Sequence, residues 1–242
     1  LGEDYGDGSS IIQERTHAFA MKSSVCLLDP RPDLPHLVRM VEHAFPLSEA
    51  ASTPVILQLR IRACHMKGSF VGKDNVAPAL SARHPAAAPP HDPNRMSHPP
   101  YTFHHERRKV DERLPAARRY IVEHGINETF SPHAADVGVI VQGGVYNALM
   151  RALALAGLTD GSGASRLPLL VLNATYPLVP EQLVAFCAGK RAVLVLEEGH
   201  PEFIEFELAA VLGRARAACA VRGKATLRQA GEYGADVIVG GL

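Results

Sequence analysis

Continuous apolar segments alternate with helix-like segments through residues 134–242 of the chain. VGVIVQ at 137–142, LPLLVLN at 167–173 and AVLVLEE at 192–198 are apolar at successive positions, which predicts strands with both faces covered. Between and after them, helical spacing appears at 146–156, 180–189 and 201–213, and short strands are expected near 217–222 and at 237–240 (VIVG). We therefore predict an α/β fold whose sheet is doubly wound and mostly parallel.

The first part of the chain, residues 1–70, has a similar pattern on a smaller scale. It predicts a helix at 11–21 (IIQERTHAFAM), an apolar patch at 25–30 (VCLLDP) and a second helix near 35–50. The β-branched and aliphatic run TPVILQLRI at 53–61 predicts a buried strand. Prolines at 30, 32 and 35 break the chain before the second helix.

A proline-rich segment at 71–103 separates these two parts. It contains ALSARHPAAAPPHDPNRMSHPP and has no apolar periodicity, so we expect an extended linker without a core of its own. The connecting segment 104–133 begins with HHERRKVDERLPAARRYIVEHG, which predicts a charged helix that ends at Gly125. Pro115 lies inside this helix, so both one helix and two shorter ones are compatible with the pattern.

The charge balance excludes some classes of partner. The chain has 25 basic and 25 acidic residues, so no net field attracts nucleic acid or an anionic membrane. Its longest apolar runs have the length of a strand, well short of the roughly 20 residues of a membrane span. No secretory signal is visible, and we expect a cytoplasmic location. The sequence opens LGEDYGDGSS without an initiator Met, and we expect it to be a piece of a longer protein.

The four cysteines lie far apart in the sequence, at Cys26, Cys64, Cys187 and Cys219. None has the CxxC spacing of a zinc or iron–sulfur site. We expect free thiols packed in a reducing compartment, and no metal or cluster held by this chain.

Two adjacent carboxylates, Glu197 and Glu198, end the strand predicted at 192–198. Neighbouring residues of a strand point to opposite sides, so the two cannot easily act on one substrate as an acid–base pair. A metal site is disfavoured because only His200 lies at a suitable spacing. An acidic edge in contact with another domain is the interpretation that the pattern favours.

Other polar motifs have both a structural and a functional interpretation. Gln142-Gly143-Gly144 joins a strand to a helix without the full phosphate-binding pattern, so a tight turn is favoured over a nucleotide loop. TYPLVP at 175–180 is favoured as a helix start over a ligand-binding edge. Arg62 and His65 end the predicted strand, where they fit either a carboxylate site or a solvated strand end. Ser10 and Gln13 form a capping box. The pair at 104–105 (HH) is assigned to a solvated face.

An ordered set of motifs resembles one enzyme family over nearly the whole chain apart from the linker. GEDYGDGSSIIQERTHAFA and LRIRACH are similar to the late part of the pyrimidine-binding domain of thiamine-diphosphate-dependent 2-oxoacid:ferredoxin oxidoreductases, most of all the indolepyruvate ferredoxin oxidoreductase alpha subunits. GVIVQGGVYNALMRAL, NATYPLVPEQLVAF, VLVLEEGHPEFIEFEL and GKATLRQAGE resemble that family's transketolase-C-terminal-like domain. The chain departs from the family at Ile11, where Gln is usual, and at Cys64, where Ser precedes the His.

This resemblance implies a domain organisation. Residues 1–70 are expected to be the C-terminal part of a pyrimidine-binding-like α/β domain, followed by the Pro-rich linker 71–103 and the connecting helix 104–133. Residues 134–242 are expected to form the transketolase-C-terminal-like domain.

The resemblance also implies an activity, the oxidative decarboxylation of an aryl pyruvate such as indolepyruvate to an acyl-CoA, with ferredoxin as electron acceptor. Thiamine diphosphate and Mg²⁺ would be held by the full-length enzyme, and iron–sulfur clusters would lie outside this chain. Ser9 and Ser10 are expected near the pyrimidine ring, and Arg62 and His65 at the mouth of the substrate site. No catalytic residue is expected here, so the chain alone should be inactive.

The implied partners are the remaining domains of the same enzyme, a beta subunit, ferredoxin and CoA, in an oligomer. Two alternatives stay open. One is a non-catalytic assembly or dimerisation module. The other is a piece of a different thiamine-dependent enzyme, either a 2-oxoglutarate:ferredoxin oxidoreductase or a transketolase.

Overall fold

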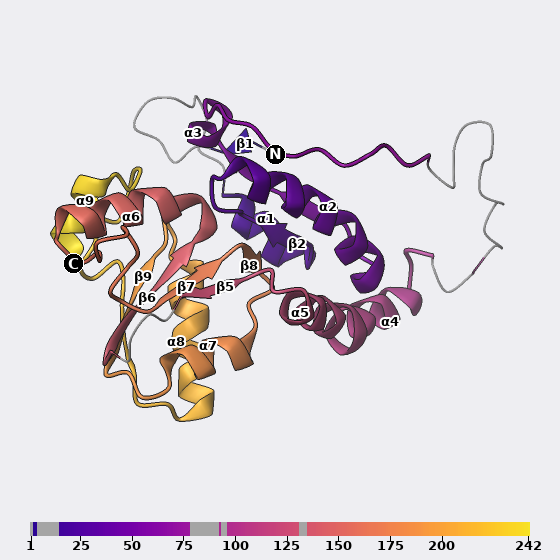
Figure 1. Ribbon diagram of the computed structural model, residues 1–242. Coiled ribbons are helices and arrows are strands. Elements are labelled where there is room, and N and C mark those ends of the chain that lie inside the picture. The colour runs from indigo at the N-terminus through magenta and orange to yellow at the C-terminus, as the bar shows by residue number, and fades with distance from the viewer. Residues whose placement is uncertain (1, 4–14, 78–91, 93–95, 131–134) are drawn as a thin grey trace.

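The computed structural model describes residues 2–3, 15–77, 92, 96–130 and 135–242 (Figure 1). We call residues 15–77, with the strand at 174–176 that joins their sheet, the first lobe, and residues 128–130 with the rest of 135–242 the second lobe. None of the described helices is both long enough and apolar enough to cross a lipid bilayer.

The second lobe is built on a five-stranded sheet with the order β10-β9-β6-β7-β5. Its strands are β5 (Glu128–Phe130), β6 (Val137–Gln142), β7 (Leu169–Leu172), β9 (Ala192–Leu196) and β10 (Ala220–Arg222). All neighbouring pairs are parallel except β5 with β7. The predicted mostly parallel sheet is therefore confirmed.

Helices cover both faces of this sheet (Figure 1). They are α6 (Tyr146–Leu155) and α9 (Ala235–Gly241) on one face, and α7 (Pro180–Cys187) and α8 (Phe203–Ala215) on the other. Successive strand residues belong to different cores: Val139 and Val141 pack with α6, whereas Ile140 packs with α7 and α8. This division explains why the central strands are apolar at successive positions, and it confirms the doubly wound α/β class.

One predicted strand of the second lobe is wrong, because VIVG at 237–240 lies inside the helix α9. In this segment only Ile238 is fully buried, where it packs in the core beneath α6. A segment that buries only one face can form a surface helix. The packing of Ile238 against the core thus overrides the β propensity of the neighbouring valines.

The first lobe has a three-stranded sheet with the order β3-β2-β8. It consists of β2 (Cys26–Leu28), β3 (Val55–Leu57) and β8 (Ala174–Tyr176), with the helices α1 (Thr16–Ser23) and α2 (Leu34–Ala51) beside it. The helix predicted at 11–21 thus begins at Thr16, and residues 11–14 lie outside the described part. β8 follows β7 directly, so the chain passes from the large sheet into the sheet of the first lobe.

The single strand predicted at 53–61 is wrong. The segment forms β3, then β4 (Leu59–Arg60), which pairs with β1 (Gly2–Glu3), and then the short helix α3 (Ile61–Cys64). The split occurs because Pro30, which follows the partner strand β2, has no N–H with which to extend the pairing. Arg62 therefore lies in a helix and not at the end of a strand.

The connecting helix is continuous from α4 (Tyr101–Arg108) through a π-helical turn (Lys109–Arg113) to α5 (Leu114–Glu123). Pro115 lies inside this continuous helix, just after the π-helical turn, and its missing N–H removes one helical hydrogen bond there. Gly125 follows with a φ of +57°, as predicted for the helix end. The helix begins at Tyr101, inside the predicted linker. Residues 65–77 contain no helix or strand, while 78–91 and 93–95 lie outside the described part.

Asn173 joins the two sheets between β7 and β8. Its side chain is buried, accepts a hydrogen bond from the Arg31 N–H at 3.0 Å and donates one to the Ile126 carbonyl at 2.8 Å. Its carbonyl accepts from the Asp29 N–H at 2.8 Å. These bonds fix the end of β2 against the second lobe and so position the polar residues that follow both strands.

Candidate functional site

Four polar side chains meet where the two lobes touch. They are Asp29 after β2, Arg60 at the end of β4, Gln142 at the end of β6 and Glu198 after β9. Carboxyl ends of parallel strands meet at one edge of a sheet, which is also where α/β proteins bind ligands. We call this group the interlobe cluster.

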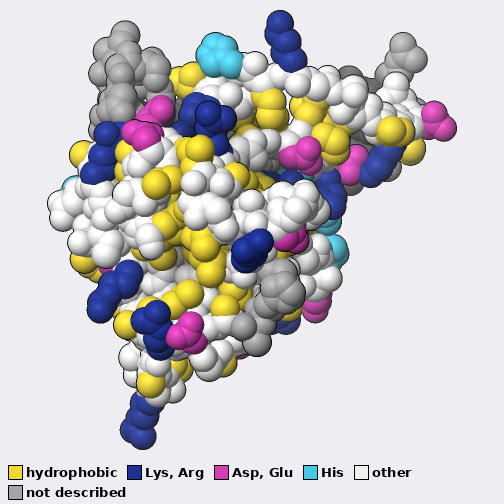
Figure 2. Space-filling view, turned by 60° about the vertical axis from the view of Figure 1, so that its left-hand side comes forward, with side chains coloured by type: hydrophobic (Ala, Val, Ile, Leu, Met, Phe, Trp, Pro, Cys, Tyr) yellow, Lys and Arg dark blue, Asp and Glu magenta, His cyan; other side chains and the backbone are white. Residues whose placement is uncertain are grey.

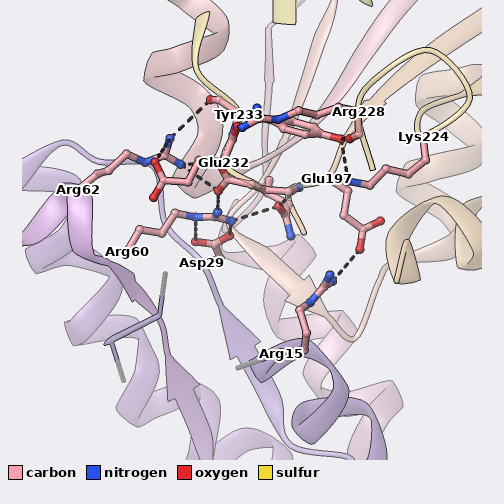
Figure 3. Close-up of polar contacts among 11 residues, drawn as sticks. Arg15, Asp29, Arg60, Arg62, Glu197, Lys224, Arg228, Glu232 and Tyr233 are labelled. Carbon is pink, nitrogen blue, oxygen red and sulfur yellow. Dashed lines mark hydrogen bonds and ion pairs between the residues drawn. The ribbon is translucent and has the colours of Figure 1, made fainter. Parts of the chain in front are cut away.

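Arg60 lies at the centre of the interlobe cluster (Figure 3). Its Nη2 is 2.5 Å from Asp29 Oδ2, and its Nε donates to Oδ1 of the same carboxylate at 3.3 Å. Its Nη1 forms an ion pair with Glu198 Oε2, and Nη2 also donates to Gln142 Oε1 at 3.1 Å. Asp29 and Glu198 are each 1% exposed and Arg60 is 4% exposed. Buried charges of this kind are tolerated only when they are paired.

The glycine turn after β6 permits this close approach. A Cβ atom at Gly144 would overlap the Arg60 guanidinium and Asp29 Oδ1, and a Cβ atom at Gly143 would overlap the Asp29 carbonyl. The predicted tight turn is thus required by the packing of the two lobes. The space that a phosphate would need in a nucleotide loop is filled by first-lobe atoms.

Arg62 reaches the same carboxylate from α3. Its Nη2 donates to both oxygens of Glu198, each at 2.9 Å, and its side chain is 36% exposed. Its Nη1 lies 3.5 Å from the Tyr233 carbonyl and 4.0 Å from Glu232 Oε2. Glu198 also accepts a bond from the Tyr233 N–H at 2.5 Å. One buried carboxylate therefore binds two arginines of the first lobe and the C-terminal loop of the second.

A pocket of about 270 Å³ opens beside the interlobe cluster. Arg62 and His65, the two residues predicted to bind substrate, both line it, together with Arg60, Gly144 and Asn147. The rest of the lining is apolar: Pro30, Pro32, Leu37, Leu59, Ala63, Met66 and Ala148. Hydrophobic side chains also gather in the centre of the face shown in Figure 2, with Lys and Arg side chains around them. Ser9 and Ser10, predicted to contact a cofactor, lie outside the described residues.

Figure 3 shows the Glu197 side chain directed toward Arg15. Its neighbour Glu198 pairs with Arg60 and Arg62 instead, as expected for adjacent positions that point to opposite sides. Glu197 Oε2 accepts from the N–H groups of Ile204 and Glu205 at 2.8 and 3.1 Å, so it caps α8. Its Oε1 lies 3.5 Å from Arg15 Nη2. Burial raises the pKa of Glu197 to about 7, although Arg15 and the two N–H groups oppose this shift. Within the described ranges no three His, Cys, Asp or Glu side chains are grouped to hold a metal ion.

Both glutamates therefore contact arginines of the first lobe, which agrees with the predicted interface edge. Next to Arg15, His17 stacks on the Phe203 ring with the centroids 5.3 Å apart. Only 1% of His17 is exposed, and burial lowers its pKa to about 4.

The C-terminal loop, residues 223–234, closes over Glu198. Lys224 Nζ donates to Tyr233 Oη at 2.7 Å, and this hydroxyl donates to the Arg228 carbonyl at 2.6 Å. Burial lowers the pKa of Lys224 to about 8.

Sequence reasoning missed Arg60, Asp29 and Tyr233. A signal existed for the first two, since Asp29 follows the buried strand β2 and Arg60 follows the half-buried apolar run that contains β3, the neighbour of β2. Tyr233 gave no signal, because its loop has neither helix nor strand periodicity. All four cysteines are free, as predicted, but Cys64 is exposed.

Comparisons with known proteins are consistent with this fold. No family model matches the sequence. Over 95% of the chain it is 32% identical to the indolepyruvate oxidoreductase subunit IorA of Methanothermobacter thermautotrophicus. It is 28% identical to that of Methanothermobacter marburgensis over 95% of the chain, and 26% identical to that of Thermococcus kodakarensis over 83%. The chain spans about a third of these relatives, 35%, 35% and 30% of their lengths.

The fold is similar to that of a solved structure. This structure is a 2-oxoglutarate:ferredoxin oxidoreductase from Magnetococcus marinus, with 2-oxoglutarate, coenzyme A and succinyl-CoA bound. The TM-score is 0.52 at 16% identity, over 88% of this chain and 41% of that one.

Proposed function

Because this chain belongs to the 2-oxoacid:ferredoxin oxidoreductase family, we propose that it is part of an enzyme that oxidatively decarboxylates an aryl 2-oxoacid such as indolepyruvate. The products would be an acyl-CoA and reduced ferredoxin. The names of the relatives, indolepyruvate oxidoreductase subunit IorA, support the choice of substrate. In this proposal the first lobe is the end of a pyrimidine-binding-like domain and the second a transketolase-C-terminal-like domain.

The observation that carries the proposal is the pocket beside the interlobe cluster. Arg62 supplies a partly exposed guanidinium to hold the substrate carboxylate, and His65 lines the same pocket. A guanidinium is well suited to a carboxylate because its N–H groups form charge-assisted hydrogen bonds. The volume, about 270 Å³, is near the lower end of small-molecule pockets, which begin at roughly 300 Å³.

The lining favours a substrate with one carboxylate and an apolar side chain. Seven of the lining residues are apolar, whereas the second arginine, Arg60, is already engaged by Asp29 and Glu198. A dicarboxylate such as 2-oxoglutarate would bring its second charge against this largely apolar wall, where the described lining offers only His65 and Asn147 as further polar side chains, and burying a charge without an ion pair is costly. The 2-oxoglutarate enzyme named above makes that substrate class the second candidate.

Thiamine diphosphate and Mg²⁺ would be held mainly by other parts of the enzyme, together with the iron–sulfur clusters. Among the described residues, no three His, Cys, Asp or Glu side chains are grouped to hold a metal ion. The space beside the glycine turn, which a phosphate would need, is filled by Asp29 and Arg60. Ser9 and Ser10 would contact the pyrimidine ring. When bound, thiamine diphosphate supplies the carbanion stabilisation that decarboxylation requires. The residues of this chain bind and orient the oxoacid, and we expect the chain without its partners to show no turnover.

The test is Arg62→Ala in the assembled enzyme, with 2-oxoacid-dependent ferredoxin reduction as the assay. Loss of a charge-assisted hydrogen bond costs about 1.5–3 kcal/mol, which corresponds to a KM for the aryl 2-oxoacid raised roughly ten- to a hundredfold. Arg191→Ala, which removes an exposed arginine on the second lobe, is the control and should leave KM unchanged. An unchanged KM in Arg62→Ala would refute the assignment. Turnover by the isolated chain would refute the dependence on partners.

A further inference from the structure

Glu198 links the core of the molecule to the pocket. We propose that Glu198 is a positioning residue, whose carboxylate sets the direction in which the Arg62 guanidinium faces the substrate. This inference rests on the proposed function, in which Arg62 binds the substrate carboxylate. Glu198 itself is 1% exposed and does not line the pocket, so it acts only through Arg62.

Contacts on several sides hold the Glu198 carboxylate in place. Arg60 Nη1 pairs with its Oε2, and the Tyr233 N–H donates to Oε1 at 2.5 Å. Its own N–H donates to Gln142 Oε1 at 2.9 Å, which fixes the backbone as well. Contacts from β4 and the C-terminal loop thus hold both carboxylate oxygens, and a bond to β6 holds the backbone of the same residue.

Arg62 lacks such restraints of its own. It lies in a four-residue helix, and more than a third of its side chain is exposed. Its two shortest contacts, both 2.9 Å, are the bonds from Nη2 to the oxygens of Glu198. Among the residues that the structure describes, its Nη1 makes only longer contacts, at 3.5 and 4.0 Å. Glu198 therefore anchors one end of the guanidinium and leaves the other end for a ligand, which reduces the entropy lost when a carboxylate binds.

Charge alone does not explain this arrangement. Two arginines, Arg60 and Arg62, face the carboxylates of Asp29 and Glu198, and Glu232 lies 4.0 Å from Arg62, so these formal charges leave no net positive charge. Such a group attracts a carboxylate only if one guanidinium edge is correctly aimed at it. The direction of Arg62, and not the net field of the cluster, thus determines affinity.

Glu198→Asp separates direction from charge, because the carboxylate is kept while it moves back by one methylene. In the assembled enzyme we expect this variant to raise the KM for the aryl 2-oxoacid about tenfold, with kcat nearly unchanged. In an Arg62→Ala background the same substitution should leave KM unchanged, since its effect passes through Arg62. Glu198→Gln provides a second variant of the original length, and its effect on KM must also vanish in that background.

Glu197→Asp is the matched control, because Glu197 is equally buried and adjacent but faces Arg15 and α8. It should leave KM unchanged, and thermal unfolding of each variant reports any loss of stability. If Glu198→Asp raises KM equally with and without Arg62, or lowers only stability and kcat, the inference is overturned while the proposed function stands. If Arg62→Ala itself leaves KM unchanged, the proposed function fails, and the inference fails with it.

Discussion

Replacing Arg60 by Met should destabilise the chain far more than the same replacement of an exposed arginine that is also paired with an aspartate. Arg60→Met leaves the buried Asp29 carboxylate without its ion pair, whereas Glu198 keeps Arg62. Removing one partner of a buried ion pair costs about 3–5 kcal/mol. The methionine side chain fills most of the vacated volume, so the loss reports the unpaired charge more than a cavity.

Arg191→Met is the matched control. Arg191 Nε lies 2.6 Å from Asp136 Oδ2, a distance almost equal to the 2.5 Å between Arg60 and Asp29. The two pairs differ in burial. The side chains of Arg191 and Asp136 are 72% and 66% exposed, whereas those of Arg60 and Asp29 are 4% and 2% exposed. An exposed pair contributes about 0–1 kcal/mol. The difference between the two variants therefore measures the effect of burial.

Urea unfolding, followed by far-ultraviolet circular dichroism, gives the free energy of unfolding of each variant. We expect Arg60→Met to lose at least about 2 kcal/mol more than Arg191→Met. Adding Asp29→Ala to Arg60→Met should recover part of this loss, because it removes the unpaired carboxylate. Equal losses in the two arginine variants would mean that the interlobe cluster is hydrated, which would refute the reasoning from burial.

Three further predictions concern packing and pH. Gly144→Ala should lower the free energy of unfolding by about 1–3 kcal/mol because its Cβ overlaps Arg60, whereas Gly161→Ala, in open space, should be neutral; equal effects in urea unfolding would contradict this. Burial lowers the pKa of His17 from 6.5 to about 4. Between these two pH values the unfolded chain binds more protons than the folded chain, so the contribution of His17 to stability is lost as pH falls from 6.5 to 4. In His17→Phe, melting temperatures should therefore fall less between pH 6.5 and 4 than in the wild type, and parallel curves would refute the assignment. Burial raises the pKa of Glu197 from 4.5 to about 7. Between these two pH values the folded chain binds more protons than the unfolded chain, so the contribution of Glu197 to stability is lost as pH rises from 4.5 to 7. Glu197→Gln should remove this loss, and a melting temperature that falls from pH 4.5 to 7 as steeply as in the wild type would contradict it.

The sheet of the second lobe could be predicted because its strands satisfy a local rule. VGVIV at 137–141 and LPLLVL at 167–172 are apolar at every position, and only a strand covered on both faces buries such a run. The helices between them have a 3.6-residue apolar spacing, so each element carries its own signal. The segment at 237–240 failed because its four residues are too few for either period to decide.

The interlobe cluster could not be predicted in full because its partners are distant in sequence. Arg60 is 31 residues from Asp29 and 138 from Glu198. Their contact depends on the chain passing from β7 in the large sheet to β8 in the sheet of the first lobe. No local sequence pattern predicts this passage. The pairing of Glu198 with the first lobe was expected only as a general interface, without its arginines.

The predicted substrate residues, Arg62 and His65, could be identified from the sequence only in part. Arg62 and His65 were selected from a motif, and they line one pocket although the strand in which they were placed is a helix. A spacing of three residues places side chains on opposite faces of a strand but on the same face of a helix, so the helical segment is what brings Arg62 and His65 into one pocket. Their functional roles remain predictions.

The most direct test of the central claim, that the pocket between the lobes binds the carboxylate of the substrate, is a crystal structure of the assembled enzyme with an aryl 2-oxoacid bound. We predict that the carboxylate accepts hydrogen bonds from Arg62 while Glu198 still holds the opposite end of that guanidinium. A substrate bound elsewhere, with Arg62 paired only to Glu198 as in the free chain, would contradict the claim.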